Sequence, residues 1–192
     1  MRLPIRYYGD PVLRKPARAV NTFDDELARL AEDMIETMHD DNGVGLAAPQ
    51  VGVPLRLFVA SELQPGDDDE EMVHVRDHVI VNPRITQRNG VQIVQEGCLS
   101  IPGIYVDDME RDLSLHLRYQ DLNGAEHELE ARGHFAQVIQ HETDHLDGVL
   151  FFDRLPRERQ QAFLEEHRQE LAQIQRQAKA FLKELRTGAK GQ

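Results

Sequence analysis

The sequence predicts an α+β fold in which antiparallel β-sheets pack around a central helix, with an N-terminal helix and a long C-terminal helix. Alternating apolar and polar residues in the middle of the chain predict strands, and apolar residues at helical spacing predict the helices. The strands come before the central helix and do not alternate strictly with helices, which favours α+β over a parallel α/β fold. The 192 residues suffice for one domain with a sizeable core.

The first element is a helix predicted over residues 24–39. Thr22, with Asp25 three residues later, resembles a capping pair at its start. The Asn-Gly-Val-Gly stretch at 42–45 ends the helix. Its apolar residues recur at helical spacing and are Leu27, Leu30, Ala31, Met34, Ile35 and Met38.

Short apolar runs at residues 55–60, 79–83 and 91–94 each predict a separate strand. Residues 62–71 contain a Pro-Gly pair and then a run of consecutive acidic residues. Because like charges repel and Pro-Gly favours turns, this stretch predicts an open surface loop.

A hairpin is the clearest local prediction. Residues 113–119 alternate apolar and polar side chains, as a half-buried strand does. Asp-Leu-Asn-Gly at 121–124 predicts a turn, and the alternation resumes at 127–131 on the return strand.

After Gly133 the apolar period becomes helical, which predicts the central helix over residues 135–146, ended by Gly148. A second long helix is predicted over residues 157–186.

The chain has a net charge of -12, and this charge is unevenly distributed along the sequence. Residues 154–192 carry 9 Lys/Arg and 5 Asp/Glu, whereas the remainder carries 13 and 29. An acidic body argues against nucleic-acid binding by the body, and no DNA partner is expected, but the basic tail leaves binding to nucleic acid open. No apolar run is long enough to span a membrane, no signal peptide is visible, and the single cysteine excludes an internal disulfide. These features predict a cytoplasmic protein.

The central helix carries the main chemical motif of the chain. His141 and His145 are four residues apart, so their imidazoles project from one helix face and are able to hold one divalent metal. Glu142, beside the first histidine, has the position of a general base. The central helix is therefore predicted to be a metal-binding helix.

The third ligand has two candidates, since three protein ligands plus water are typical of a catalytic metal site. Thermolysin-like zinc peptidases take this ligand from a glutamate on a later helix, where Glu165 and Glu166 lie here, but the rest of that ligand pattern is missing. Cys98 follows a predicted strand, next to Gly97, which lets a backbone or ligand come close. We favour Cys98, and a zinc peptidase remains the enzymatic alternative.

Three segments resemble the signature motifs of the peptide deformylase family, in that family's order. They are Gly-Val-Gly-Leu-Ala-Ala-Pro-Gln at 43–50, Glu-Gly-Cys-Leu-Ser at 96–100 and Gln-His-Glu-Thr-Asp-His at 140–145. The resemblance extends over most of residues 3–155. It implies a metal-dependent hydrolase that removes the N-formyl group from the initiator methionine of nascent polypeptides and releases formate.

The resemblance also implies the metal site. Cys98, His141 and His145 would bind one divalent metal, with water as the fourth ligand and Glu142 as general acid and base. The metal implied in cells is Fe²⁺, and Zn²⁺, Ni²⁺ or Co²⁺ are able to occupy the same site.

The substrate contacts are implied in the same way. The Gln50 side-chain amide and the Leu99 backbone N–H would bind the formyl oxygen. The residues implied to pair with the substrate backbone are Val44, Gly45 and Gly97, and those matching the methionine pocket are Val44, Val94 and Val138.

The C-terminal helix is longer than catalysis requires. We expect one catalytic domain at residues 1–155 and a C-terminal helical extension at 156–192, packed on it or projecting from it. In some bacterial relatives this helix docks on the ribosome, and basic side chains here would suit RNA phosphates. A non-enzymatic alternative is a metal-stabilised, ribosome-associated protein. The basic residues are Arg176, Lys179, Lys183, Arg186 and Lys190.

Overall fold

The computed structural model describes residues 1–68 and 71–188 and confirms the α+β class. Within these residues, one antiparallel sheet has the strand order β1-β2-β3-β4-β5, so each strand pairs with its neighbour in the sequence. The strand bounds are Gly45–Ala47 (β1), Leu57–Pro65 (β2), Met72–Cys98 (β3), Ile101–Gln120 (β4) and Glu126–Arg132 (β5). The helix bounds are Asp25–Asp40 (α1), His134–Leu146 (α2), Arg157–Glu166 (α3) and Arg168–Gly188 (α4).

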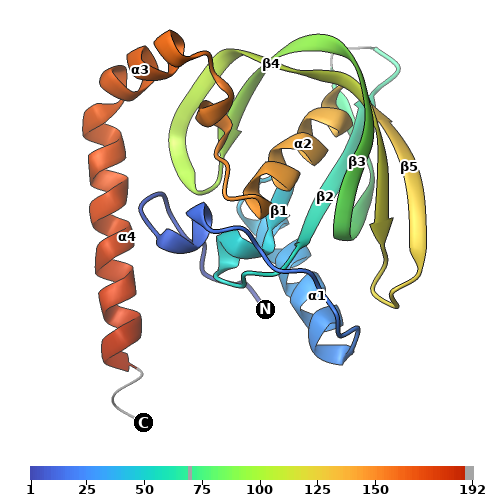
Figure 1. Ribbon diagram of the computed structural model, residues 1–192, viewed down its shortest axis with the longest axis horizontal. Helices are drawn as coiled ribbons and strands as arrows, with labels where there is room; N and C mark the ends of the chain where they lie inside the picture. Colours follow the sequence, from blue (N-terminus) through green and yellow to red (C-terminus); the bar gives the residue numbers. More distant parts are fainter. Residues whose placement is uncertain (69–70, 189–192) are drawn as a thin grey trace.

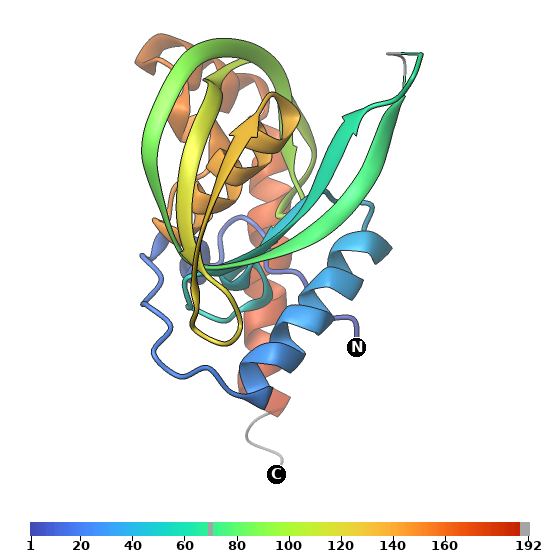
Figure 2. The ribbon, with the colours of Figure 1, turned by 90° about the vertical axis from the view of Figure 1, so that its right-hand side faces the viewer.

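The sheet curves around α2, as Figures 1 and 2 show. One face of α2 packs on the sheet in a buried cluster that includes Phe58, Leu117, Phe135 and Ile139. Helix α1 lies against another part of the sheet and buries Met34 there with its apolar stripe. The central position predicted for α2 is therefore confirmed, and the sheet forms a single unit instead of several.

The runs predicted as separate strands at 79–83 and 91–94 are parts of one continuous strand, β3, so that prediction is wrong in its boundaries. The reason is that β3 bends without leaving its partner β4. Register shifts interrupt the pairing, the first of them between Val81 and Arg84, where Asn82 has a φ of 49°. Such bulges bend a strand while the ladder continues on both sides.

The predicted loop at 62–71 is also wrong over residues 62–65, which belong to β2 and pair with β3. Glu62 is not left to repel its acidic neighbours, because His78 lies 2.7 Å from its carboxylate on the paired strand. The turn closes with a hydrogen bond from the Gly66 N–H to the Glu71 carbonyl. Asp69 and Glu70, the remaining part of that predicted loop, lie outside the described residues.

Two helix ends differ from the predictions. The cap of α1 is Asp24, whose carboxylate accepts from the Leu27 N–H at 3.0 Å, and not the pair at residues 22 and 25. The predicted single helix over 157–186 is interrupted at His167. Phe163 on α3 and Ile174 on α4 pack in one shared apolar cluster on either side of this interruption.

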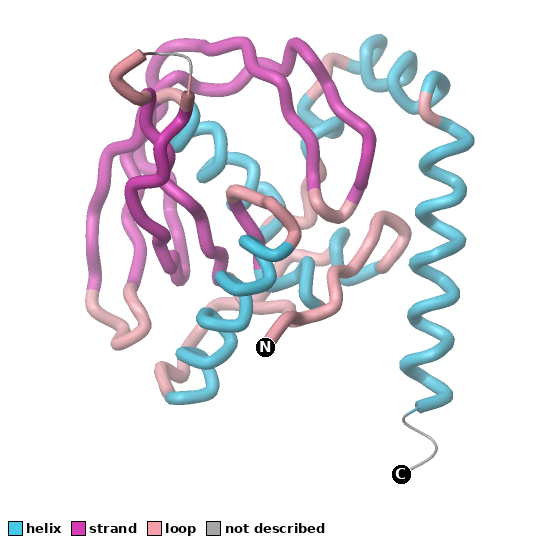
Figure 3. The backbone as a smooth tube through the Cα atoms, turned by 180° about the vertical axis from the view of Figure 1, so that it is seen from behind, coloured by secondary structure: helices cyan, strands magenta, loops and turns pink. Residues whose placement is uncertain are grey.

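Helix α4 runs along the side of the molecule, next to the N-terminal segment (Figures 1 and 3). Leu171 and Ile174 bury against the cluster that contains Phe151 and Phe152. Farther along α4, the Arg6 guanidinium lies 5.3 Å from the centroid of the Phe181 ring. None of the helices in the described part of the chain is long and apolar enough to cross a membrane.

Candidate metal centre

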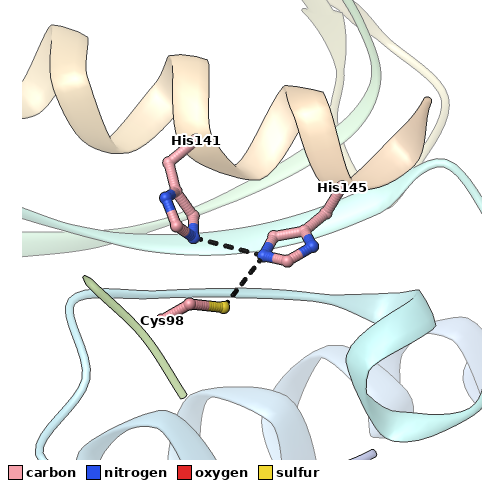
Figure 4. A group of neighbouring side chains, drawn as sticks. All are labelled: Cys98, His141 and His145. Carbon is pink, nitrogen blue, oxygen red and sulfur yellow. Dashed lines mark hydrogen bonds between the residues drawn. The ribbon is translucent and has the colours of Figure 1, made fainter. Parts of the chain in front are cut away.

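Three side chains of the ligand types that transition metals prefer meet beneath α2. His141 and His145 lie one turn apart on this helix, and their Nε2 atoms are 3.2 Å apart. Cys98 is the last residue of β3, and its Sγ lies 3.3 Å from the His145 Nε2. Figure 4 shows both rings pointing from α2 toward the cysteine. We call Cys98, His141 and His145 the metal centre.

The spacing and chemistry of the metal centre fit a tetrahedral cation. Its three ligand atoms all lie within 4.8 Å of one another. Bonds of the usual length to nitrogen and sulfur would separate such atoms by about 3.3–3.6 Å, and the two separations given above are close to that range. Burial lowers the pKa of His145 well below its usual value and keeps the ring neutral, as a ligand must be.

A buried ion-pair network fixes the orientation of His141. The Glu96 carboxylate accepts a hydrogen bond from the His141 Nδ1 at 3.2 Å and another from the Arg111 Nε at 3.0 Å. Burial acts to raise the pKa of Glu96, but the hydrogen bonds from His141 and Arg111 lower it to about 2. Burial acts to lower the pKa of His141, but hydrogen bonds with Cys98 and Glu96 raise it well above its usual value. Metal binding would therefore displace a proton from Nε2, while Glu96 favours the remaining proton on Nδ1.

The same network continues beneath the helix. Arg111 also donates to the Asp144 carboxylate at 2.8 Å, and Arg154 donates to the other oxygen of Asp144 at 2.7 Å. Arg111 and Asp144 are both buried. Four charged side chains thus support the ligand His141. Three of them, Glu96, Arg111 and Asp144, lie on β3, β4 and α2, respectively.

Glu142 is the carboxylate placed beside the metal centre. It is buried, and its Oε2 has no hydrogen-bond partner among the described residues. Burial raises the pKa of Glu142 to about 7. A residue that both accepts and donates a proton works best with a pKa close to the working pH, so this value suits proton transfer at neutral pH. Gly45 makes this position possible, because a Cβ there would lie 2.5 Å from the Glu142 Oε1.

Gln50 is held in one orientation. Its Oε1 accepts from the Ala47 N–H at 2.8 Å, and its Nε2 donates to the Ser100 Oγ at 3.1 Å. The same nitrogen lies 3.6 Å from the Cys98 Sγ. Because the oxygen is already engaged, the amide presents a donor to the metal centre, and this donor does not titrate.

A cavity of about 390 Å³ opens over these groups. Val44 and Val138 line it, together with Leu99, which lies in the turn between β3 and β4. The Tyr105 ring packs against Gly97, where a Cβ would lie 2.6 Å from the ring. The side chains that border the metal centre in this cavity include Gln50, Glu96 and Glu142.

Three of the residues considered in the sequence lie elsewhere. Val94 is not among the described residues that line the cavity; it packs against the apolar cluster around Phe151. The part of β3 that lines the cavity begins at the next residue, Gln95, where the pairing with β4 is irregular. Glu165 and Glu166 are exposed on α3 and do not belong to the group of ligand atoms that Cys98 joins.

Sequence reasoning missed Arg111 and Ser100. Arg111 is two residues before Leu113 on the inward face of β4, and the alternation could have indicated it. An arginine on a buried face requires an acidic partner, which would have directed attention to Glu96. The contact of Ser100 with Gln50 joins residues 50 apart, and no local pattern indicates it.

Comparisons with known proteins give one family. Residues 2–161 match the family model described as polypeptide deformylase. The peptide deformylase of Thermus thermophilus is 50% identical over 193 residues, covering 98% of this chain and 100% of that protein. A crystal structure of peptide deformylase from Thermus thermophilus matches with a TM-score of 0.83 and 49% identity, over 92% of this chain and 99% of the other. An Acinetobacter baumannii peptide deformylase, solved with Met-Ala-Ser bound, matches with a TM-score of 0.74 and 33% identity, over 81% and 99%.

Proposed function

The chain belongs to the polypeptide deformylase family, and from that premise we propose which of its residues carry the reaction. It is a metal-dependent hydrolase that removes the N-formyl group from the initiator methionine of nascent polypeptides and releases formate. The convergence of Cys98, His141 and His145 beside a buried Glu142 is the observation that supports the assignment of roles.

Cys98, His141 and His145 hold one divalent cation. When bound, the cation supplies Lewis acidity, which lowers the pKa of a coordinated water and polarises a carbonyl. We assign Fe²⁺ as the metal in cells, with Zn²⁺, Ni²⁺ or Co²⁺ as replacements in purified protein. A thiolate and two imidazoles are compatible with each of these ions, so availability decides among them.

Glu142 moves the proton. Its carboxylate takes a proton from the attacking water and later gives it to the leaving amine, as microscopic reversibility requires. Its burial supports this role, because a pKa of about 7 lets the group accept and release a proton at neutral pH. The atom balance is complete: water adds to the formyl carbon, the C–N bond breaks, and formate and a free amine leave.

Gln50 and Leu99 stabilise the developing oxyanion. The Gln50 Nε2 and the Leu99 backbone N–H donate to the formyl oxygen as negative charge forms on it. A single donor of this kind contributes about 3–4 kcal/mol to the transition state in other hydrolases. The hydrogen bond from the Ala47 N–H supports this role for Gln50, since it prevents the amide from turning its oxygen inward.

The substrate lies in the cavity as an added strand. Val44, Gly45 and Gly97 offer backbone groups to it, which is the geometry of β-strand addition. Val44 and Val138, which line the cavity, contact the methionine side chain, and Val94 of the same expected pocket packs against the cluster around Phe151. The relative with bound Met-Ala-Ser supports a peptide that begins with methionine at this site.

We assign the enzyme to the cytoplasm, where nascent chains are made.

We also assign residues 1–155 as the catalytic domain and 156–192 as an extension that contacts the ribosome. The described basic residues of α4 are exposed, whereas Lys190 lies outside the described residues. Replacing Arg176, Lys179 and Lys183 with glutamine should abolish co-sedimentation with ribosomes at low salt and leave deformylation of a free peptide unchanged. Unchanged co-sedimentation would contradict the proposed contact between the C-terminal extension and the ribosome.

Two variants test the catalytic assignment. Cys98→Ser should lose both metal and deformylation of a formyl-Met peptide. Glu142→Ala should retain metal and lose activity by roughly 10²–10⁴-fold, the range for general acid–base catalysis. Glu165→Ala, on exposed α3, is the control and should retain both. Loss of metal in Glu165→Ala would support a peptidase-like ligand set, and an active Glu142→Ala would exclude Glu142 as the base.

A further inference from the structure

A second group of ligand-type side chains lies on the surface, away from the reaction. His39 is in the last turn of α1, and His74 and Asp77 are on β3 just after the β2–β3 turn. The His39 Nε2 lies 2.7 Å from one carboxylate oxygen of Asp77, and the His74 Nε2 lies 3.0 Å from the other. We call His39, His74 and Asp77 the surface cluster.

The carboxylate at the centre of the surface cluster is held in place. Ser61 on β2, which is buried, donates its hydroxyl to Asp77 at 2.7 Å. Partial burial acts to raise the pKa of Asp77, but hydrogen bonds from His39, Ser61 and His74 lower it to about 2. The group is therefore ionised at neutral pH, and one of its oxygens has a hydrogen-bonded support like those that orient carboxylate ligands.

The arrangement matches what a divalent cation requires. One ligand atom from each of the three side chains lies within 4.8 Å of the others. The two histidine side chains are 46% and 48% exposed, so they are free to move the short distance that coordination needs and to leave a position for water. Two imidazoles and a carboxylate are ligands that Zn²⁺ and its neighbours in the transition series accept.

We propose that His39, His74 and Asp77 form a second divalent metal site, specific for Zn²⁺-like ions and separate from the metal centre. Binding uses the histidine tautomers that carry their proton on Nδ1, so that each Nε2 is free to coordinate. The cation replaces the two histidine hydrogen bonds of Asp77, while Ser61 continues to hold that carboxylate.

The position of the surface cluster gives such a cation a structural consequence. It would tie the end of α1 to the β2–β3 hairpin. The segment that follows His39 leads to the cavity, where Asn42 and Val44 are lining residues. The Val44 carbonyl accepts from the Ser61 N–H at 2.8 Å, so Ser61 contacts both the cavity wall and the surface cluster. A bound cation would therefore restrict the motion of one wall of the substrate cavity.

The test measures zinc content by equilibrium dialysis of the zinc-loaded enzyme against micromolar free Zn²⁺. Wild type should hold two zinc ions per chain, whereas His74→Asn and Asp77→Asn should hold one. His127→Asn is the matched control, because His127 also pairs with a single aspartate, Asp121, at 2.7 Å on an exposed surface. This control should hold two. Deformylation by zinc-loaded His74→Asn, measured before the dialysis against further Zn²⁺, should equal that of zinc-loaded wild type and so show an intact fold.

Nuclear magnetic resonance of the histidine rings locates the second ion. Adding Zn²⁺ to the zinc-loaded enzyme should shift the ring signals of His39 and His74 and leave those of His127 in place. One zinc per chain in wild type, or a second zinc that leaves the His39 and His74 signals unmoved, would overturn the proposal.

Discussion

The metal centre and the surface cluster each gather three ligand-type side chains, but their surroundings differ. At the metal centre the two histidines are buried, and four charged side chains from neighbouring elements fix His141. In the surface cluster both histidines are nearly half exposed, and one buried serine orients the only carboxylate. Since buried charges must be paired, the first site depends on a complete network, whereas the second depends on a few hydrogen bonds in water.

The largest expected effect comes from breaking the buried network. Arg111→Met would leave Glu96 with only His141 and leave Asp144 with only Arg154. Removing one partner of a buried ion pair costs about 3–5 kcal/mol of unfolding free energy. Denaturant unfolding at fixed free metal measures this loss.

Arg88→Met is the matched control for that measurement. Arg88 joins β3 to β4 through Asp112 at 2.8 Å, but this pair is exposed. Its removal should cost at most about 1 kcal/mol. Equal losses in the two variants would show that the network beneath α2 is no more critical than a surface pair.

The next effect concerns the oxyanion donor. Gln50→Glu retains the oxygen that accepts from Ala47 but replaces the donor with a second oxygen near Cys98. We expect kcat to fall by roughly 10²–10³-fold, as for loss of one oxyanion donor. Gln173→Glu, on the exposed side of α4, should leave kcat unchanged. An active Gln50→Glu enzyme with normal metal content would contradict the role of Gln50.

A smaller effect is expected from neutralising the carboxylate behind His141. Glu96→Gln removes the charge that orients this ring and should weaken metal binding by about 10–100-fold. Competition with a chelator measures the affinity. Glu110→Gln, on the exposed face of the paired strand, provides the comparison and should bind metal as wild type does. If both variants bind equally, Glu96 has no part in holding the metal.

The contrast between the two sites also explains what the sequence could predict. His141, Glu142 and His145 lie within one helix, so their spacing alone indicates their shared face. Cys98 and Gln50 are identified through motifs that resemble a known family. The remaining supports come from long-range contacts, such as Arg111 with Glu96 and Ser61 with Asp77, and helical or strand periodicity contains no information about such pairs.

The same reasoning accounts for the errors in the predicted strands and helices. Alternation correctly predicts the hairpin formed by β4 and β5, because its residues pair locally. It fails for β3, whose bulges interrupt the alternation although the strand continues. Helical periodicity fails at His167, because Phe163 and Ile174 keep helical spacing across the break and the apolar pattern therefore does not indicate it.

The smallest expected effect belongs to the surface cluster without added zinc. Asp77→Asn should lower the free energy of unfolding at neutral pH by less than about 1 kcal/mol, since both histidines that pair with Asp77 are nearly half exposed. The pKa of Asp77 is lowered from 3.8 to about 2 by the folded environment, so the folded protein binds fewer protons at this group than the unfolded chain. Its contribution is therefore complete above about pH 4 and is lost as the pH falls toward 2.

Urea unfolding of wild type and Asp77→Asn at several pH values measures this loss. Both proteins carry the same metal centre, so acid-induced release of that metal cancels in the difference between them. The difference should shrink across the window from about pH 4 to 2, because protonated Asp77 no longer attracts the histidines. A difference that stays constant through the window would assign the effect to the shape of the side chain and not to its charge, and the surface cluster would then lack the anionic ligand that a cation needs.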